Sequence, residues 1–211
     1  MSHMSVRFPE LEGKHVVITG SSRGIGLGVA EAFAAQKCRL LLLADDPAVF
    51  DVAHRLGCAA EMVDITDQNG LDAALTSLPK IDVLVNNAGL ERLTPLADRS
   101  SDNLATFRRV LDVNVTGTFI ATQSALPKMS TGARVIVTAS TWSRAAEALF
   151  GAYVASKHAL IGLIKTWTRE LGPLGINVNG VAPGWVNTAA AMRSLATLSN
   201  HENRPETDIL E

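Results

Sequence analysis

Tyr153, the only tyrosine in the chain, stands four residues before Lys157, and Ser140 lies thirteen residues upstream of it. On a helix, positions four apart share one face, so the Lys157 ammonium can lie beside the Tyr153 phenol. A free phenol has a pKa of about 10. A cation ~4 Å away would stabilise the phenolate by roughly 4 kcal/mol, or about three pKa units. The spacing predicts an acid/base pair that works near neutral pH, although alone it also fits an interface tyrosine and a solvated lysine.

The elements that must position this trio are short runs rich in Val, Ile and Leu, which alternate with segments of helix length. This is the pattern of βαβ units around a parallel sheet, and apolar runs without strict alternation are typical of strands covered on both faces. The expected strands are Lys14 to Thr19, Arg39 to Ala44, Cys58 to Val63, Ile81 to Asn86, Ala133 to Ala139 and Ile176 to Val181. The expected helices are Ile25 to Gln36, Pro47 to Leu56, Asp67 to Ser77, Asp102 to Met129 and Gly151 to Leu171. The sequence thus predicts an α/β fold with a doubly wound parallel sheet in three layers.

A glycine-rich turn, Thr19 to Gly26, follows the first expected strand and leads into a helix. Its glycines are spaced Gly-x-x-x-Gly-x-Gly and allow a sharp turn and a close approach of backbone to ligand. The free amides at the start of the helix attract a pyrophosphate. By itself the segment could be an ordinary glycine-rich turn, but its place between strand and helix favours a dinucleotide site.

With this turn, Asn86-Asn87-Ala88-Gly89 after the fourth strand, and Ser140, Tyr153 and Lys157 in order, the chain resembles the short single-domain branch of the short-chain dehydrogenase/reductase family. The resemblance runs from about Gly13 to Thr188 and implies a Rossmann-like fold. It also implies that Ser140 holds the substrate oxygen and Tyr153 transfers the proton. Lys157 would bind the nicotinamide ribose and lower the pKa of Tyr153. Asn114 matches the family asparagine that helps to hold a water in the proton relay; without the family it could be a solvated or capping amide.

The resemblance also implies a set of cofactor-binding residues spread along the whole chain. Asp64 would hydrogen-bond adenine, although an aspartate that ends a strand often only forms a turn. Asn87 and Gly89 would flank the adenosine ribose, and the Val186 backbone and Thr188 hydroxyl would anchor the nicotinamide carboxamide. The full set is Gly20, Ser22, Arg23, Gly24, Ile25, Gly26, Asp45, Asp64, Ile65, Asn87, Ala88, Gly89, Tyr153, Lys157, Pro183, Gly184, Val186 and Thr188.

The implied activity is reversible, NAD(P)-dependent hydride transfer to or from a carbon that bears a hydroxyl or carbonyl, with no metal. Substrate identity stays open. Aromatic and aliphatic walls would suit an apolar ketone or 3-oxoacyl group, whereas Glu91 or Arg144 could bind a sugar or polyol if they are not merely solvated charges. The residues expected to face the substrate are Leu90, Glu91, Trp142, Arg144, Phe150, Trp185 and Met192. A catalytically idle dinucleotide-binding module, for interaction or redox sensing, is the alternative of a different class.

The choice between NAD and NADP depends on opposed charges near the end of the second strand. A carboxylate from Asp45, with Asp46 beside it, would accept hydrogen bonds from the ribose hydroxyls and repel a 2′-phosphate. Arg23 in the glycine turn favours NADP instead. Each could be an ordinary surface charge, and Asp45-Asp46-Pro47 could simply begin a helix. We expect NAD, because a carboxylate beside a phosphate costs more where water is partly excluded.

Composition excludes several other classes. The formal charge is 19 basic minus 21 acidic residues, or −2, with no basic block, so we expect no nucleic acid or membrane partner. No uncharged apolar run reaches the ~18 residues of a membrane span, and we expect a cytoplasmic protein. Residues 1–4 read as a remnant of an expression tag, and residues 5–211 as one domain. Cys38 and Cys58 lack metal or redox spacing and fit small buried thiols.

The C-terminal part departs from the family pattern. The segment from about 185 to 211 would supply the substrate loop, and after Leu198 it becomes polar and loop-like. Relatives usually add a further helix and a seventh strand, so we expect either a truncated chain or a sheet without that edge strand. The helix Gly151 to Leu171 has more apolar positions than one sheet face can bury, which predicts at least a homodimer; a homotetramer stays open.

Overall fold

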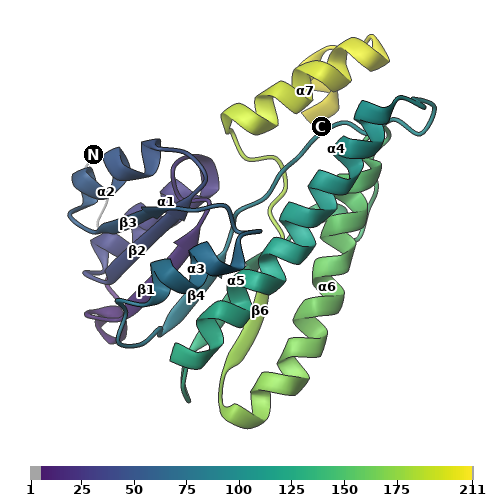
Figure 1. The fold of residues 1–211 in the computed structure, drawn as a ribbon. Helices are drawn as coiled ribbons and strands as arrows, with labels where there is room; N and C mark the ends of the chain where they lie inside the picture. The colour runs from purple at the N-terminus through teal and green to yellow at the C-terminus, as the bar shows by residue number, and fades with distance from the viewer. Residues whose placement is uncertain (1–5, 211) are drawn as a thin grey trace.

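Six parallel strands form one sheet in the order β3-β2-β1-β4-β5-β6 in the computed structural model, which describes residues 6–210 (Figure 1). The strands are β1 (His15–Thr19), β2 (Arg39–Ala44), β3 (Ala59–Met62), β4 (Val83–Asn86), β5 (Arg134–Thr138) and β6 (Asn177–Val181). Successive strands are added to one side of β1 as β2 and β3, and to the other side of β4 as β5 and β6. The loops that follow β1 and β4 therefore lead away from each other and leave a crevice at the carboxyl edge of the sheet. The doubly wound parallel sheet, with six strands in the described part, is confirmed.

Helices cover the sheet on two sides and make the expected three layers. Helices α3, α5 and α6 pack on one face, and α1 and α2 pack on the other (Figure 1). The helices are α1 (Gly24–Ala35), α2 (Ala48–Leu56), α3 (Gln68–Leu75), α4 (Ser101–Leu111), α5 (Thr118–Ala125), α6 (Gly151–Leu171), α7 (Ala189–Glu202) and α8 (Glu206–Leu210). No helix among residues 6–210 is long and apolar enough to cross a membrane.

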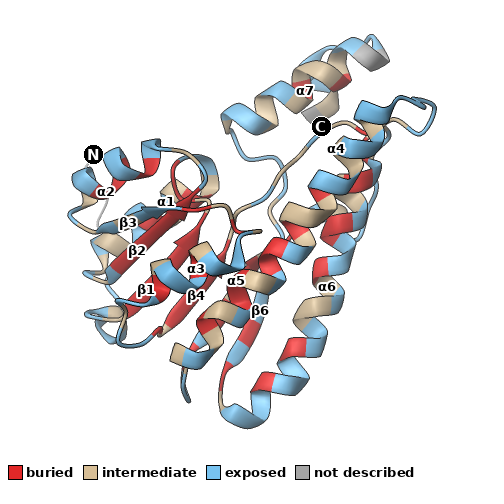
Figure 2. Ribbon diagram, in the orientation of Figure 1, coloured by how far each residue is buried: buried red, intermediate tan, exposed pale blue. Residues whose placement is uncertain are grey.

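Strand β2 shows why the central runs lack polar alternation. Its four consecutive leucines, residues 40–43, are all buried, but successive side chains enter different cores. Leu41 and Leu43 pack with α3, α5 and α6, whereas Leu40 and Leu42 pack with α1 and α2. Because both faces are covered here, every position must be apolar. Figure 2 shows this continuous buried centre in the strands of the sheet.

The edge strand β6 is different. Val178 is buried against α6, but Asn177 and Asn179 are exposed, and Val181 keeps 55% of its surface accessible. Helices α1 and α2 do not extend over this side of the sheet in Figure 1. The expectation that all strands are covered on both faces is therefore wrong for β6, since only one face of this strand has helices packed on it.

The helix expected from Asp102 to Met129 is present from Ser101 to Lys128, but it is not a regular α-helix throughout. Helix α4 begins at Ser101, with the Ser100 hydroxyl accepting a hydrogen bond from the Asn103 amide at 3.1 Å. A π-helical segment, Asp112–Gly117, then separates α4 from α5. A Cβ at Gly117 would lie 2.7 Å from the Ile65 side chain, so this helix passes the β3 loop at close range. Such wide turns are rare and often lie at functional sites.

The polar C-terminal segment is helical rather than loop-like as far as Glu202. The Thr188 hydroxyl caps α7 by accepting a hydrogen bond from the Ala191 amide at 3.1 Å. Leu195 and Leu198 are both 1% exposed, so burial of these residues stabilises the helix, and the polar residues continue it by one turn. It ends where Asn203 adopts a left-handed φ of 52°. The suspected tag remnant, residues 1–4, lies outside the described residues.

Candidate active site

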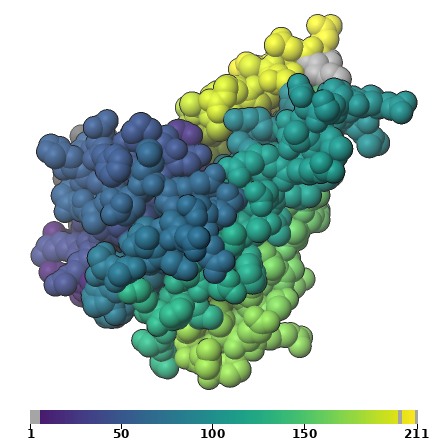
Figure 3. Space-filling view, viewed as in Figure 1, coloured from purple at the N-terminus to yellow at the C-terminus, as the bar shows by residue number. Residues whose placement is uncertain are grey.

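A cleft runs along the carboxyl edge of the sheet, between the glycine-rich turn and the start of α6. Figure 3 shows a hollow between the N-terminal half, in blue, and α7, in yellow. Of the expected site residues, all but Gly26 and Asn114 line the cleft: Gly20, Ser22, Arg23, Gly24, Ile25, Asp45, Asp64, Ile65, Asn87, Ala88, Gly89, Ser140, Tyr153, Lys157, Pro183, Gly184, Val186 and Thr188. Residues separated by up to 168 positions, from Gly20 to Thr188, thus face one space.

The glycine-rich turn is closed by contacts that leave no room for side chains. Gly20 has a left-handed φ of 64°, and a Cβ there would lie 2.6 Å from the Ala88 Cα. A Cβ at Gly26 would lie 2.1 Å from the Gly20 carbonyl oxygen. The Asn87 amide nitrogen donates to that same oxygen at 3.0 Å. The turn holds the first amides of α1 toward the cleft, which is the geometry that binds a pyrophosphate.

The charges expected to choose the cofactor are arranged unequally. Asp46 accepts hydrogen bonds from the Ser22 hydroxyl at 2.6 Å and from the Arg23 guanidinium at 2.8 Å. The Asp46 carboxylate thus binds two residues of the glycine turn, and it forms an ion pair with Arg23. Asp45 is exposed and lines the cleft without taking part in that pair.

Asp64 both forms a turn with Thr66 and lines the cleft. Its Oδ1 accepts from the Thr66 amide at 2.9 Å and from the Thr66 hydroxyl at 2.8 Å, and its Oδ2 accepts from Arg109. Burial raises the pKa of Asp64, but the hydrogen bonds from Thr66 and then Arg109 outweigh burial, and the pKa is lowered. The carboxylate therefore stays charged at neutral pH.

Ser140, Tyr153 and Lys157 come together from β5 and α6. Ser140 follows β5 and lies close enough to lower the pKa of Tyr153, which is in the first turn of α6. Lys157 lies one turn further along the helix, with its Nζ 5.5 Å from the Tyr153 ring centroid. The ammonium donates to the Thr138 carbonyl at 2.7 Å. The tertiary structure thus assembles the trio expected from sequence spacing.

The electrostatics of the trio differ from the expectation. Burial, followed by the Glu91 carboxylate, raises the pKa of Tyr153, and the hydrogen bond with Ser140 only partly offsets them. Burial lowers the pKa of Lys157 to about 8, although Glu91 acts in the opposite direction. We expected Lys157 by itself to lower the pKa of Tyr153 toward neutral pH. This expectation is wrong when only the groups of the protein are considered, because the pKa of Tyr153 is raised. The reason is that Lys157 is only 4% exposed and directs its ammonium at Thr138 rather than at the phenol oxygen.

Asn114 lies in the π-helical segment and is neither solvated nor a cap. It is 1% exposed, and its side chain makes hydrogen bonds with both the amide and the carbonyl of Leu90. Asn114 Oδ1 accepts from the Leu90 amide at 2.7 Å, and Nδ2 donates to the Leu90 carbonyl at 2.9 Å and to the Ser156 hydroxyl at 2.9 Å. The side chain therefore ties the loop after β4 to α6, beside Tyr153 and Lys157.

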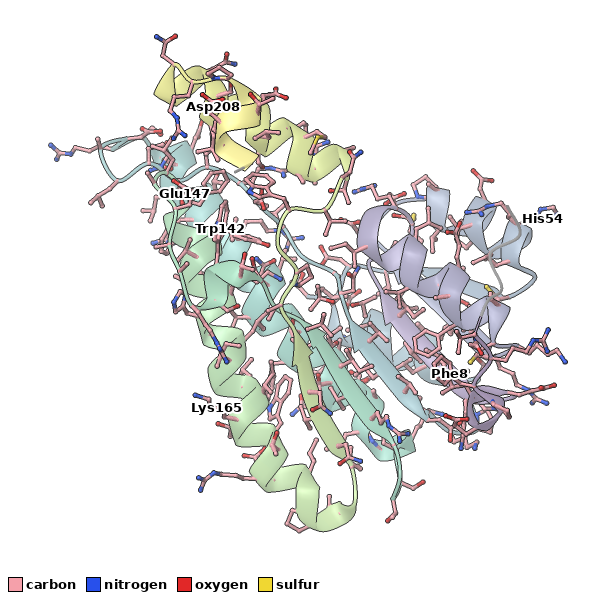
Figure 4. All side chains as sticks on the ribbon, turned by 180° about the vertical axis from the view of Figure 1, so that it is seen from behind. Phe8, His54, Trp142, Glu147, Lys165 and Asp208 are labelled. Carbon is pink, nitrogen blue, oxygen red and sulfur yellow. The ribbon has the colours of Figure 1, made fainter. Side chains whose placement is uncertain are left out.

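An aromatic cluster forms one wall of the cleft. The Trp142 ring meets Tyr153 edge-on at 5.9 Å between centroids and Trp185 edge-on at 6.0 Å. Trp142 lies near the start of α6, below α7, in Figure 4. Leu90, Glu91, Trp142 and Trp185 line the cleft as expected, whereas three further candidates do not: Arg144, Phe150 and Met192. Arg144 is exposed, and Phe150 is buried behind Trp142.

Glu91 lines the same cleft as the aromatic cluster and is not a solvated loop charge. Its carboxylate accepts a short hydrogen bond from the Ser194 hydroxyl of α7. Burial raises the pKa of Glu91, against the opposing effects of Ser194, Lys157 and Arg193. Glu91 also acts on the pKa values of both Tyr153 and Lys157. It is thus the carboxylate that shares the cleft with the acid/base pair.

Sequence reasoning missed the cleft residue Arg109 on α4, and Ser194 on α7, which binds the cleft residue Glu91. Neither belongs to a motif, and each reaches its partner across a long stretch of chain. Arg109 meets Asp64 from 45 positions away, and Ser194 meets Glu91 from 103 positions away. Such pairings depend on how helices pack over the sheet, so local spacing carries no signal for them.

Comparisons with known proteins agree with this geometry. The profile of the short chain dehydrogenase family matches residues 14–199. The chain is 35% identical to oxidoreductase UcpA of Escherichia coli K12 over 214 residues, covering 96% of this chain and 80% of that protein. It is 36% identical to sorbitol dehydrogenase of Cereibacter sphaeroides, covering 92% of this chain and 79% of that protein. A short chain dehydrogenase from Burkholderia cenocepacia, solved with NADP, superposes with a TM-score of 0.77 at 32% identity, over 88% of this chain and 82% of that one.

The chain belongs to the short-chain dehydrogenase/reductase family. It is an NAD(P)-dependent oxidoreductase that acts on CH–OH and C=O groups of small molecules. The glycine turn fits this class of cofactor, since the space that a Cβ at Gly26 would fill is already taken by the Gly20 carbonyl and the Asn87 amide.

The turn predicts opposite outcomes for two glycines of one helix. Gly26→Ala should weaken NADH binding at least about tenfold, because its methyl group would displace the Gly20 carbonyl by more than an ångström from its position. Gly28→Ala is the matched control: nothing lies within 4 Å of its added methyl, and it should stabilise the exposed helix by about 0.5–1 kcal/mol without changing binding. Fluorescence titration and thermal unfolding measure both. Wild-type affinity in Gly26→Ala would exclude this turn from the cofactor site.

Proposed function

We propose that the protein interconverts a secondary alcohol and a ketone through Ser140, Tyr153 and Lys157. The observation that carries the proposal is that Ser140, Tyr153 and the buried Lys157 line the same cleft as the glycine turn. The nicotinamide group, when bound, supplies the hydride donor or acceptor. The protein then has to hold the substrate oxygen and move its proton.

Each member of the trio has a role that its surroundings support. Ser140 holds the substrate oxygen, and the Tyr153 phenol gives or takes the proton. Lys157 has three donors, of which the Thr138 carbonyl takes one, so two remain for the cofactor ribose. Asn114 acts through the backbone, because its two hydrogen bonds to Leu90 fix the loop that carries the neighbouring Glu91.

We assign the remaining cofactor residues to one extended dinucleotide, because they line the same cleft. The turn from Gly20 to Gly26 binds the pyrophosphate, Asp64 and Ile65 flank the adenine, and Asn87 and Gly89 flank its ribose. Asn87 does so mainly by shaping the wall, because its amide nitrogen already donates to the Thr19 and Gly20 carbonyls at 3.2 and 3.0 Å. The nicotinamide end is bound by Pro183, Gly184, Val186 and Thr188, of which Thr188 also caps α7.

The trio predicts that Tyr153→Phe keeps cofactor affinity and loses most turnover. The ring and its edge-on contact with Trp142 remain, and only the proton-transfer group is removed. Acid/base groups contribute on the order of 10² to 10⁴ in rate. The measurement is nicotinamide absorbance with a panel of secondary alcohols and ketones, together with NADH binding. A loss below about tenfold, with chemistry rate-limiting, would remove Tyr153 from this role, and absence of wild-type turnover across the panel would favour the binding-module alternative.

Asp45 supports a preference for NAD. Its carboxylate faces the cleft, whereas the charge of Arg23 is paired with Asp46. Wild-type kcat/KM should be higher with NAD than with NADP, and Asp45→Ser should shift the ratio toward NADP because a repulsive charge is removed. Asp51→Ser, an equal charge change on exposed α2, is the control and should leave the ratio unchanged. A wild-type preference for NADP that Asp45→Ser leaves unaltered would show that Arg23 dominates.

Glu91 favours a sugar or polyol over a purely apolar ketone or 3-oxoacyl group as substrate. A half-buried carboxylate in a cleft with an aromatic wall accepts hydrogen bonds from additional hydroxyls, while the aromatic rings pack on C–H groups. The Ser194 hydroxyl, which occupies the carboxylate in this structure, is exchangeable for a substrate hydroxyl. The likeness to sorbitol dehydrogenase supports the same class.

Glu91→Gln should therefore lower kcat/KM for a polyol relative to a mono-alcohol such as cyclohexanol. The expected fall in this ratio is roughly ten- to a hundredfold, since a hydrogen bond to a charged group contributes about 1.5–3 kcal/mol. The mono-alcohol reports any change in the acid/base pair, which Glu91 also influences. Ser194→Ala keeps the carboxylate and should keep the polyol preference. An unchanged ratio in Glu91→Gln would return Glu91 to a structural role.

We also propose that the protein forms at least a homodimer through α4, α5 and α6. Leu104 and Phe119 are 50% and 42% exposed on these helices. The Phe119 ring packs on the buried Trp167 of α6, with 6.5 Å between the ring centroids, so this exposed apolar side chain lies where α5 meets α6. Light scattering at micromolar concentration is the measurement. A homotetramer and a cytoplasmic location remain predictions from the sequence.

A further inference from the structure

Arg109 is a cleft residue that the trio and the glycine turn do not use. It projects from α4 to the end of the cleft that Val63, Asp64 and Ile65 also line. Its Nη2 donates to Asp64 Oδ2, and its Nη1 lies 3.2 Å from the Thr66 hydroxyl and 3.4 Å from Asp112 Oδ2. The side chain is nevertheless 43% exposed. The guanidinium is thus held in place at its edge, while part of it stays open.

This arrangement is unusual for a purely structural ion pair. Asp64 and Thr66 come from the loop after β3, and Asp112 begins the π-helical segment, so Arg109 joins two elements at the wall of the cleft. Acceptors at the edge of a guanidinium leave its flat face free, and that face stacks on aromatic rings, including nucleic-acid bases. An exposed surface ion pair alone contributes little to stability.

We propose that Arg109 belongs to the adenine site: its ion pair keeps Asp64 charged and oriented, and its guanidinium face packs against the adenine ring. The inference rests on the proposed function, because it requires the adenosine half of the cofactor at this end of the cleft. The charged Asp64 accepts a hydrogen bond from the amino group of adenine, and Val113 and Ile65 supply apolar surface in the same part of the cleft. Arg109 is a positioning residue for the cofactor and takes no part in proton transfer.

The test separates the adenine end from the nicotinamide end. Wild type, Arg109→Ala and Arg109→Lys are titrated with NADH, with reduced nicotinamide mononucleotide, which lacks adenosine, and with AMP. Arg109→Ala should weaken NADH and AMP binding about tenfold, the order expected of a stacked, charge-assisted contact, and leave the mononucleotide unchanged. Arg109→Lys keeps the charge beside Asp64 but loses the flat face, so it should weaken the same two ligands by a smaller factor. Arg108→Ala, on the exposed side of α4, is the control and should match wild type.

The outcomes distinguish this inference from the function it rests on. Equal weakening of all three ligands, or no weakening of any, in Arg109→Ala overturns it and leaves Arg109 as a tie between α4 and the β3 loop. If Arg109→Ala does not fold, Arg109→Lys carries the same test, with the adenosine-dependent loss as its readout. A wild-type protein that binds neither NADH nor NADPH would instead contradict the proposed function, and the assignment of Arg109 would fall with it.

Discussion

The site depends on the close contact between the loops that follow β1 and β4. Thr19 Oγ1 accepts from the Asn87 and Ala88 amides at 3.0 Å each, and the Asn87 side chain returns two hydrogen bonds to the first loop. Gly20 and Gly26 are needed because any side chain would separate these loops. The connections after β1 and β4 lead to opposite faces of the sheet, so these contacts close the base of the crevice and leave its mouth open.

From that contact a chain of hydrogen bonds reaches the acid/base pair. The loop after β4 continues to Leu90, whose backbone amide donates to the Asn114 side chain. The Asn114 side-chain amide nitrogen in turn donates to the Ser156 hydroxyl. Ser156 in turn donates to the Tyr153 carbonyl at 2.7 Å. The position of Tyr153 relative to the glycine turn is thus set by buried polar contacts. Such contacts tolerate little displacement, because an unpaired buried group is costly.

Charge in the site is balanced between burial and a few neighbours. Lys157 is almost inaccessible to solvent, and burial lowers its pKa. The Glu91 carboxylate opposes that effect on Lys157, and it also raises the pKa of the Tyr153 phenol. A carboxylate beside the acid/base pair therefore ties substrate recognition to proton transfer. Since Ser194 on α7 binds the same carboxylate, the position of α7 also affects the charge around Tyr153 and Lys157.

The sequence by itself determined the parallel sheet, the glycine turn and the Tyr153 and Lys157 pair, since each follows from local periodicity or from short spacing along one element. Ser140 was identified through the family resemblance. The sequence also indicated the cleft-facing Asp45 and Asp64. Only the tertiary structure decided that a π-helical segment lies between α4 and α5, that β6 is covered on one face, that Arg109 lines the cleft and that Ser194 binds Glu91. Tertiary structure also overturned the expected pKa of Tyr153. Burial and long-range pairing decide these features, and both arise only when segments distant in sequence pack together.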